Sequence, residues 1–208
     1  ISCNAAISAC ENGGQWERAL TILADMHVRT VELDVISYSV GICAFEKGGQ
    51  WEHAIGIFVE MREHKVEQDL MSYNNAINAC EKAMQWELAL ELFTEMLQQR
   101  LEPNVISYTI AISACEQSPH LEYGLELLWE SKERGVALSL SFFAWALAKL
   151  TVSDPKVIHT ALADAISQLR ACRHAPSELS TLAWASAVLG VNSPELACAL
   201  AEQAVAQI

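Results

Sequence analysis

Cysteine and histidine are the residues of this sequence that could bind a metal or take part in catalysis. The 208-residue chain has seven cysteines and six histidines. Nowhere are two cysteines separated by two residues, the spacing of many zinc sites. Three cysteines and one phenylalanine occupy equivalent places in a repeated pattern; these residues are Cys10, Phe45, Cys80 and Cys115. Because a position that accepts either residue type is an apolar packing position, we predict reduced, buried thiols and no metal site.

The histidines form no recognisable catalytic pattern. They are scattered along the chain at His27, His53, His64, His120, His159 and His174. The sequence has no glycine-rich phosphate loop after a strand and no zinc-deaminase motif. We therefore predict no catalytic residue, no cofactor and no small-molecule substrate, so the chain is expected not to be an enzyme.

Nearly the same segment occurs four times at a spacing of 35 residues. The copies open with ISCNAAISAC at Ile1, ISYSVGICAF at Ile36, MSYNNAINAC at Met71 and ISYTIAISAC at Ile106. With Val35 taken as position 1, the units run 1–34, 35–69, 70–104 and 105–139. Because Ile1 is then at position 2, the chain begins inside a unit, and we expect the array to continue before it.

Each unit is predicted to form two helices joined by a short turn. Serine recurs at position 3, where it suits a helix N-cap: Ser2, Ser37, Ser72 and Ser107. Apolar residues then follow the i, i+3, i+4, i+7 spacing of an amphipathic helix. After a break such as Gly48-Gly49, a second amphipathic helix is predicted to begin near Trp16, Trp51, Trp86 and Leu121.

Neither helix of a unit can bury its apolar face alone, so the units must stack on one another. The predicted fold is all-α, a solenoid (α-α superhelix) of stacked antiparallel helix-turn-helix repeats. Beyond residue 139 the period lengthens to about 39 residues, so that Trp145 corresponds to Trp184. Residues 140–208 are therefore predicted to be a second, Ala- and Leu-rich region of helical repeats.

The charge of the chain is strongly acidic. The net charge is −13, and residues 1–140 contribute −12 of it through 21 acidic and 9 basic residues. This balance argues against a purely electrostatic nucleic-acid binder. The longest apolar run, about residues 136–148, is too short to span a bilayer, so no membrane association is expected.

The repeated sequence resembles the pentatricopeptide repeat family over residues 1–139. The resemblance lies in the 35-residue period, in openings such as SYN at Ser72, in the second-helix segment ALELFTEM from Ala89 and in the ending EPN from Glu102. The tail, with AWALAKL and PSELSTLAWASAVLG, is similar to the 38-residue octotricopeptide-like helical repeats of organellar RNA-processing proteins. Together these resemblances imply a single-stranded RNA-binding protein that reads one base per repeat.

The resemblance also implies which residues would contact RNA. Positions 5 and 35 of each repeat would select the base, through the pairs Asn4/Asp34, Ser39/Asp69, Asn74/Asn104 and Thr109/Ser139. Position 2 would sandwich it, through Ile1, Ile36, Met71 and Ile106, and position 13 would approach phosphates, through Lys47 and Lys82. The family code then gives a target of 5′-U-G-Y-R. The asparagine and aspartate residues also suit helix caps and turns, which is the alternative explanation for them.

Four glutamates are unusual for an RNA-binding surface. Glu11, Glu46, Glu81 and Glu116 lie at position 12, seven residues and almost two helical turns after position 5. These carboxylates, here called the glutamate column, would therefore share the face of the expected base readers and repel phosphates unless each is paired. An acidic inner face would instead suit a protein partner, so a protein-interaction scaffold or a structural subunit of a large organellar complex is the alternative function. The resemblance implies a location in a mitochondrion or chloroplast, and it implies a role in RNA processing, stability or translation for the RNA-binding function.

Overall fold

The computed structural model describes residues 3–29, 33–136, 138–150, 176–188 and 194–205, and it is helical over these residues. Contacts divide the chain into two compact units, Ile1–Ser118 and Pro119–Ile208, and each is described by itself. The boundary between the two units falls within residues 105–139, which were predicted to form one repeat. The assignment of these residues to a single repeat therefore stays a prediction, as does the second region predicted from residue 140.

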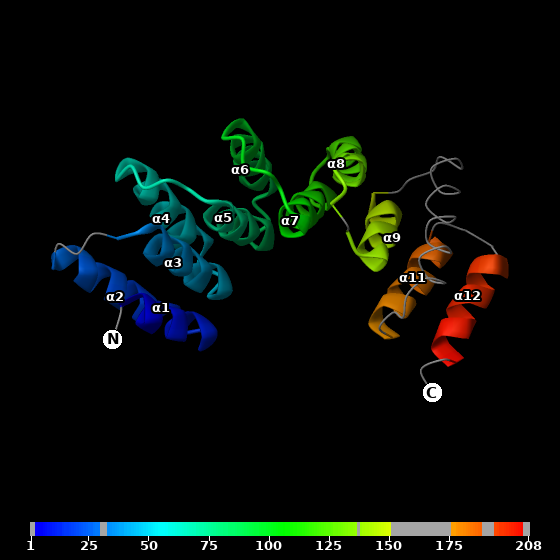
Figure 1. The fold of residues 1–208 in the computed structure, drawn as a ribbon, viewed down its shortest axis with the longest axis horizontal. Helices are drawn as coiled ribbons and strands as arrows, with labels where there is room; N and C mark the ends of the chain where they lie inside the picture. The colour runs from blue at the N-terminus through cyan, green and yellow to red at the C-terminus, as the bar shows by residue number, and fades with distance from the viewer. Residues whose placement is uncertain (1–2, 30–32, 137, 151–175, 189–193, 206–208) are drawn as a thin grey trace. The chain divides into compact units, whose positions relative to one another are not determined.

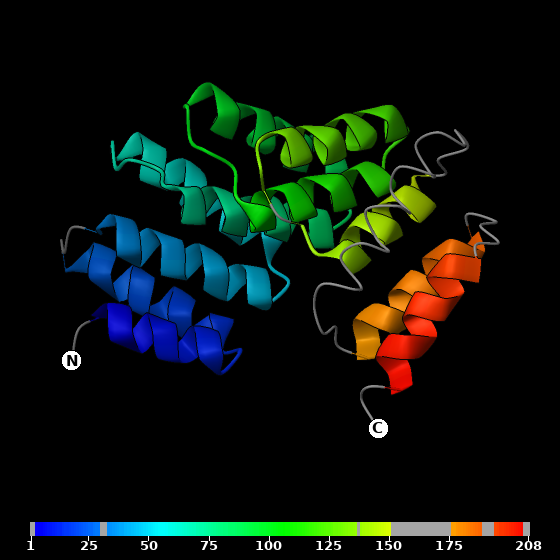
Figure 2. The same cartoon turned by 45° about the vertical axis from the view of Figure 1, so that its right-hand side comes forward.

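The first unit consists of three helical hairpins and one further helix. The helices are α1 (Cys3–Asn12), α2 (Trp16–Val28), α3 (Val35–Lys47), α4 (Trp51–Glu63), α5 (Leu70–Lys82), α6 (Trp86–Gln98) and α7 (Val105–Glu116). The first helices α1, α3, α5 and α7 pack against one another in chain order, and α2, α4 and α6 each also pack on the first helix of the next repeat. Figures 1 and 2 show the hairpins α1/α2, α3/α4 and α5/α6 side by side. The all-α solenoid and the predicted starts of the second helices are confirmed.

The second unit contains α8 (Leu121–Glu133), α9 (Leu140–Lys149), α11 (Pro176–Val188) and α12 (Pro194–Val205). Helix α11 packs against both α9 and α12. The core they share includes Leu179, Leu182, Leu196 and Ala199. The 39-residue period of the tail can be compared only in part, because residues 151–175, which follow Trp145 and α9, lie outside the described residues.

The core of the first unit follows the repeated apolar positions. Tyr73, Ala76, Ile77 and Cys80 are fully buried, as the i, i+3, i+4, i+7 spacing predicts. Cys10, Phe45, Cys80 and Cys115 are all buried as well, which confirms the apolar packing position. Burial raises the pKa of the Cys80 thiol to about 12, so this thiol stays protonated. The described residues contain no group of three or more potential metal ligands.

The N-caps of the first helices differ from the prediction. Asp34, Asp69 and Asn104 are the N-caps, and their side chains accept from the backbone N–H of the serine three residues on. Serine at position 3 is thus the third residue of the helix, and the N-cap assignment of Ser37, Ser72 and Ser107 was wrong. Both residue types are good N-caps, and a spacing of three makes them reciprocal partners, as the capping box of α7 shows.

The turns within the hairpins repeat one backbone geometry. Gly14, Gly49 and Met84 are at the same repeat position and have φ values of 63°, 69° and 60°. This left-handed conformation suits glycine and is unfavourable for Met84. Gly48, one residue earlier, is required for a different reason: a Cβ there would lie 2.5 Å from Cδ1 of Trp16. The glycine allows α2 and α3 to approach closely.

None of the helices in the described part of the chain combines the length and apolar character that membrane crossing requires.

Candidate nucleic-acid interface

Ser39 and Asp69, the expected base-reading pair of the second repeat, are in contact. Ser39 is on α3 and buried, whereas Asp69 is the N-cap of α5, the next first helix. The Ser39 hydroxyl donates to Oδ1 of Asp69 at 3.3 Å, and the same oxygen accepts from the backbone N–H of Ser72 at 2.8 Å. Oδ2 of Asp69 has no hydrogen-bond partner among the described residues, so the carboxylate keeps an acceptor for a further group.

Asn74 and Asn104, the expected pair of the third repeat, are bridged by one serine. The Ser107 hydroxyl lies 2.8 Å from Oδ1 of Asn74 and 3.1 Å from Oδ1 of Asn104. It also accepts from the backbone N–H of Asn104 at 3.2 Å. These bonds use only the amide oxygens, and within the described residues neither Nδ2 group has a hydrogen-bond partner. The bridging role of Ser107 was not predicted, although its recurrence at position 3 was visible.

The other two pairs are only partly described. Asp34 caps α3 and accepts from the backbone N–H of Ser37 at 2.8 Å and from its hydroxyl at 2.6 Å. Asn4 lies on α1, but its side chain, like the whole of Ile1, is outside the described structure. Thr109 donates to the carbonyl of Val105 at 2.7 Å. Ser139 caps α9 in the second unit, so its relation to Thr109 stays a prediction.

An exposed apolar side chain directly precedes the position-3 serines Ser37, Ser72 and Ser107 in the sequence. Ile36, Met71 and Ile106 are 60 %, 53 % and 56 % exposed, although large apolar residues are usually buried. Each is the second residue of its helix, two residues after the N-cap. The 35-residue spacing therefore puts one exposed apolar side chain beside each N-cap, in three consecutive repeats.

Two members of the glutamate column, Glu46 and Glu81, are paired with residues of the next repeat. Glu46, on α3, has a side chain that is only 5 % exposed. Its Oε1 accepts from Nδ2 of Asn78 at 2.8 Å and forms an ion pair with the Lys82 ammonium, both from α5. The groups that pair with Glu46 thus come from the next repeat and not from its own helix. Lys82 therefore holds Glu46 while its own side chain remains 55 % exposed.

Glu81 is held in the same way, one repeat further on. Nε2 of Gln117 donates to Oε1 of Glu81 at 3.1 Å and to its backbone carbonyl at 3.2 Å. Gln117 is at position 13, equivalent to Lys82. Burial raises the pKa of Glu81, and the charge of Glu116 raises it further, whereas that of Lys82 lowers it. Position 12 of one repeat and position 13 of the next thus form a recurring contact. Lys47 is exposed at the corresponding position of α3.

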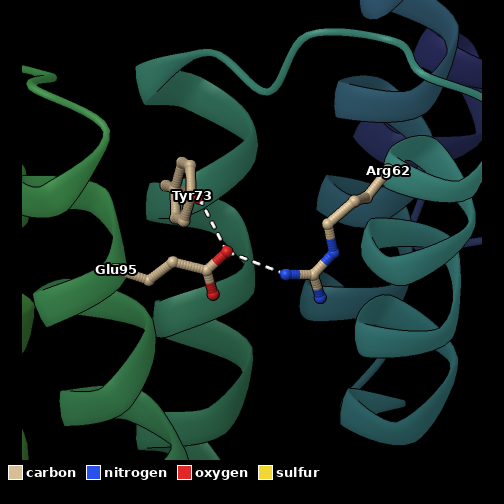
Figure 3. Close-up of polar contacts among 3 residues, drawn as sticks. All are labelled: Arg62, Tyr73 and Glu95. Carbon is tan, nitrogen blue, oxygen red and sulfur yellow. Dashed lines mark hydrogen bonds and ion pairs between the residues drawn. The ribbon is translucent and has the colours of Figure 1, made fainter.

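A second polar network links two successive repeats. Glu95, on α6, accepts from the Tyr73 hydroxyl at 3.2 Å and forms an ion pair with Arg62 of α4 at 2.8 Å (Figure 3). Burial and the adjacent Glu95 carboxylate raise the pKa of Tyr73 to about 12, so the hydroxyl remains a donor. The three groups connect helices of two successive repeats.

Three models of pentatricopeptide repeats match the sequence. A PPR repeat matches residues 1–31, a pentatricopeptide repeat domain matches residues 21–83, and a PPR repeat family matches residues 68–117. Together they cover the chain continuously from residue 1 to residue 117. No curated protein sequence matches the chain.

Solved structures with a similar fold are also pentatricopeptide repeat proteins. The protein PPR10 in complex with an 18-nt psaJ RNA element has a TM-score of 0.64 and 18 % identity, over 99 % of this chain and 28 % of that one. PPR10 from maize gives a TM-score of 0.61 and 19 % identity, over 98 % and 29 %. The PPR domain of Arabidopsis thaliana protein-only RNase P 1, in complex with tRNA, gives 0.69 and 16 % identity, over 88 % and 95 %. At these identities the likeness is one of fold, and the chain spans less than a third of PPR10.

Proposed function

The chain belongs to the pentatricopeptide repeat family, and from this premise we propose that it binds single-stranded RNA along its first helices, one base per repeat. Its relatives of known structure include two that were solved with RNA. The observation that carries the proposal is the pairing of positions 5 and 35, by direct contact in Ser39/Asp69 and through the Ser107 hydroxyl in Asn74/Asn104, beside a row of exposed aliphatic side chains.

The chemistry of the two described pairs suits recognition of a base. In the Ser39/Asp69 pair, Oδ2 of Asp69 can accept from the Watson–Crick edge of guanine, which presents N–H donors. In the Asn74/Asn104 pair, the two Nδ2 groups can donate to the carbonyl oxygens of a pyrimidine. The exposed side chains of Ile36, Met71 and Ile106 supply apolar surfaces against which an unstacked base can lie. The full reading that we propose is 5′-U-G-Y-R.

The N-cap role of Asp69 and Asn104 is compatible with base reading. Each cap uses Oδ1 for the bonds within the protein and leaves the other terminal atom of the same side chain for RNA. The cap also fixes the side-chain orientation before RNA arrives, which lowers the entropy lost on binding. Helix capping, the alternative explanation for Asp69 and Asn104, is therefore the interaction that positions these side chains for base reading.

The glutamate column offers less support for a basic protein partner than its charge suggests. Glu46 and Glu81 are engaged by Asn78, Lys82 and Gln117 of the next repeats. Their carboxylates are therefore less available to an external cation, and a phosphate chain on the same face meets less repulsion. We accordingly favour RNA over the scaffold function. We assign the segment no catalytic step and place it in organellar RNA processing, stability or translation.

The test is to exchange the pairs of two repeats. Asn74→Thr with Asn104→Asp gives the third repeat a hydroxyl and a carboxylate, as in Ser39/Asp69, and retains acceptors for the Ser107 hydroxyl and its N–H. This variant should shift the preference at the third base from pyrimidine to G by at least about tenfold, equivalent to 1.4 kcal/mol. The reciprocal variant, Ser39→Asn with Asp69→Asn, should change the second base from purine to pyrimidine.

Fluorescence anisotropy with short RNAs that contain UGCA or UGUG, with UGGA and UCCA as the sequences preferred by the two variants, and with scrambled controls of equal length, would measure both shifts. Stacking of about 1–3 kcal/mol per base, largely offset by ordering of the strand, gives an expected micromolar dissociation constant. If both variants keep the wild-type preferences, the base-reading assignment is wrong. Capture of a basic peptide without RNA binding would instead favour the scaffold function.

A further inference from the structure

Two tryptophans line an open groove in the second unit. The groove lies between α9 and α11, has a volume of about 310 Å³, and is lined by Trp145, Lys149, Ser180, Thr181 and Trp184. The two helices pack directly against each other, as Figure 1 shows. This volume is at the lower end of the range typical of small-molecule sites. None of the five lining residues is a proposed base reader.

Local spacing and packing bring these side chains to one place. On α9, Trp145 and Lys149 are four residues apart and so share a face, and Trp145 packs on Phe142 with ring centroids 5.2 Å apart. On α11, Ser180, Thr181 and Trp184 share a face for the same reason. The Trp184 side chain is 44 % exposed, which is unusual for an indole that has a packed helix beside it. An aromatic surface is thus presented to solvent.

Lys149 brings a positive charge to the groove. It is the only ionisable residue of α9, and the five lining residues include no carboxylate; Glu178, on α11, is not among them. This is a local exception in a chain with a net charge of −13. Aromatic surfaces beside a cation and hydroxyl groups match a ligand that combines a flat π-system with a phosphate.

We propose that this groove is a second, sequence-tolerant RNA site, in which a base of the single strand stacks on the exposed indole of Trp184 and Lys149 contacts a phosphate. The ligand class rests on the proposed RNA binding, whereas the groove residues differ from the proposed base readers. Every base has a π-face, so the groove contributes affinity without sequence preference.

The first test compares variants of the full chain with two 12-nt single-stranded RNAs, one containing UGCA and one scrambled. Trp184→Ala should weaken binding to both RNAs by the same factor, about 5- to 100-fold, because stacking on one base is lost. Trp184→Phe should restore part of the affinity. Val188→Ala is the matched control, because Val188 is a 52 % exposed apolar residue on the same helix outside the groove. Circular dichroism melts would check that all variants fold.

The second test measures the salt dependence of binding. Lys149→Gln should reduce the slope of log K against log salt by about 0.7, the value for one phosphate contact on a single strand. A purely structural effect would not change this slope. Lys65→Gln, which removes an exposed lysine in the first unit, should leave the slope unchanged.

The outcomes separate this inference from the proposed function. If the wild-type chain binds both RNAs equally and Trp184→Ala weakens both, the groove is supported and base reading by the repeats is wrong. If UGCA is preferred and Trp184→Ala behaves like Val188→Ala, the groove inference is wrong and base reading stands. Absence of RNA binding by the wild-type chain, or an unchanged salt slope in Lys149→Gln, would also overturn the groove inference.

Discussion

Replacing Lys82 with methionine would test whether the next repeat holds the glutamate column. The substitution retains most of the aliphatic side chain but removes the ammonium group that pairs with Glu46. The Glu46 carboxylate, 5 % exposed, would then keep only the hydrogen bond from Asn78. We expect a loss of stability because a nearly buried charge loses its counter-ion.

The magnitude follows from the burial of the two partners. Breaking a fully buried pair costs about 3–5 kcal/mol, and a hydrogen bond to a charged group contributes about 1.5–3 kcal/mol. Because the Lys82 side chain is 55 % exposed and Asn78 still donates, the lower range applies. We expect the free energy of unfolding to fall by about 2 kcal/mol, which for a chain of this length is a decrease in Tm of roughly 4–8 °C.

A double-mutant cycle in urea would isolate this contact. Glu46→Gln with Lys82→Met removes both charges, and the glutamine oxygen can still accept from Asn78, so most of the lost stability should return. Lys65→Met, at an exposed position, should change the stability by no more than about 0.5 kcal/mol. If Lys82→Met is as mild as Lys65→Met, or if the effects in the cycle are additive, the pairing between repeats does not stabilise the fold.

The same variants would separate two roles of Lys82 in RNA binding. If Lys82 acts by neutralising Glu46, Lys82→Met should weaken RNA binding and the double variant should restore it. If Lys82 itself contacts a phosphate, the double variant should remain weak, and its salt slope should fall by about 0.7.

Thermal melts would measure the effects of four other substitutions, two of glycines, one of Glu81 and one of Met84. Gly48→Ala should destabilise the fold by about 1–3 kcal/mol, since its Cβ would collide with Trp16. Gly56→Ala, in open space on α4, should instead stabilise the fold by about 0.5–1 kcal/mol. Equal effects of the two substitutions would contradict the packing argument. Because burial raises the pKa of Glu81 in the folded chain, stability is lost as the pH rises through that pKa. Glu81→Gln should therefore raise Tm at pH 7 and have little effect near pH 4, and a larger gain at pH 4 would refute this. Met84→Gly should stabilise the fold by about 0.5–1 kcal/mol because φ is 60° there, and a loss of stability would show that the Met84 side chain matters more than its backbone.

The N-caps show how far the sequence could identify the candidate site. The repeat placed Asp69 and Ser72 three residues apart at the start of a helix, but both types are good N-caps. The spacing alone could not show which one caps, so the serine was wrongly chosen. The contact between Ser39 and Asp69 was expected only from the family resemblance, because 30 residues separate them in the sequence.

Local periodicity determined the helices, their starts at residues such as Trp51 and Trp86, the buried cysteine position and the solenoid fold, since each depends on residues within one or two helical turns. Only tertiary packing decided the contacts between repeats. Glu46 and Lys82 pair across 36 residues, and Trp145 and Trp184 line one groove across 39, so both arrangements depend on the register with which whole helices pack. Amphipathic periodicity shows which face of a helix is buried, but not which residue of a neighbouring helix lies opposite each side chain on that face.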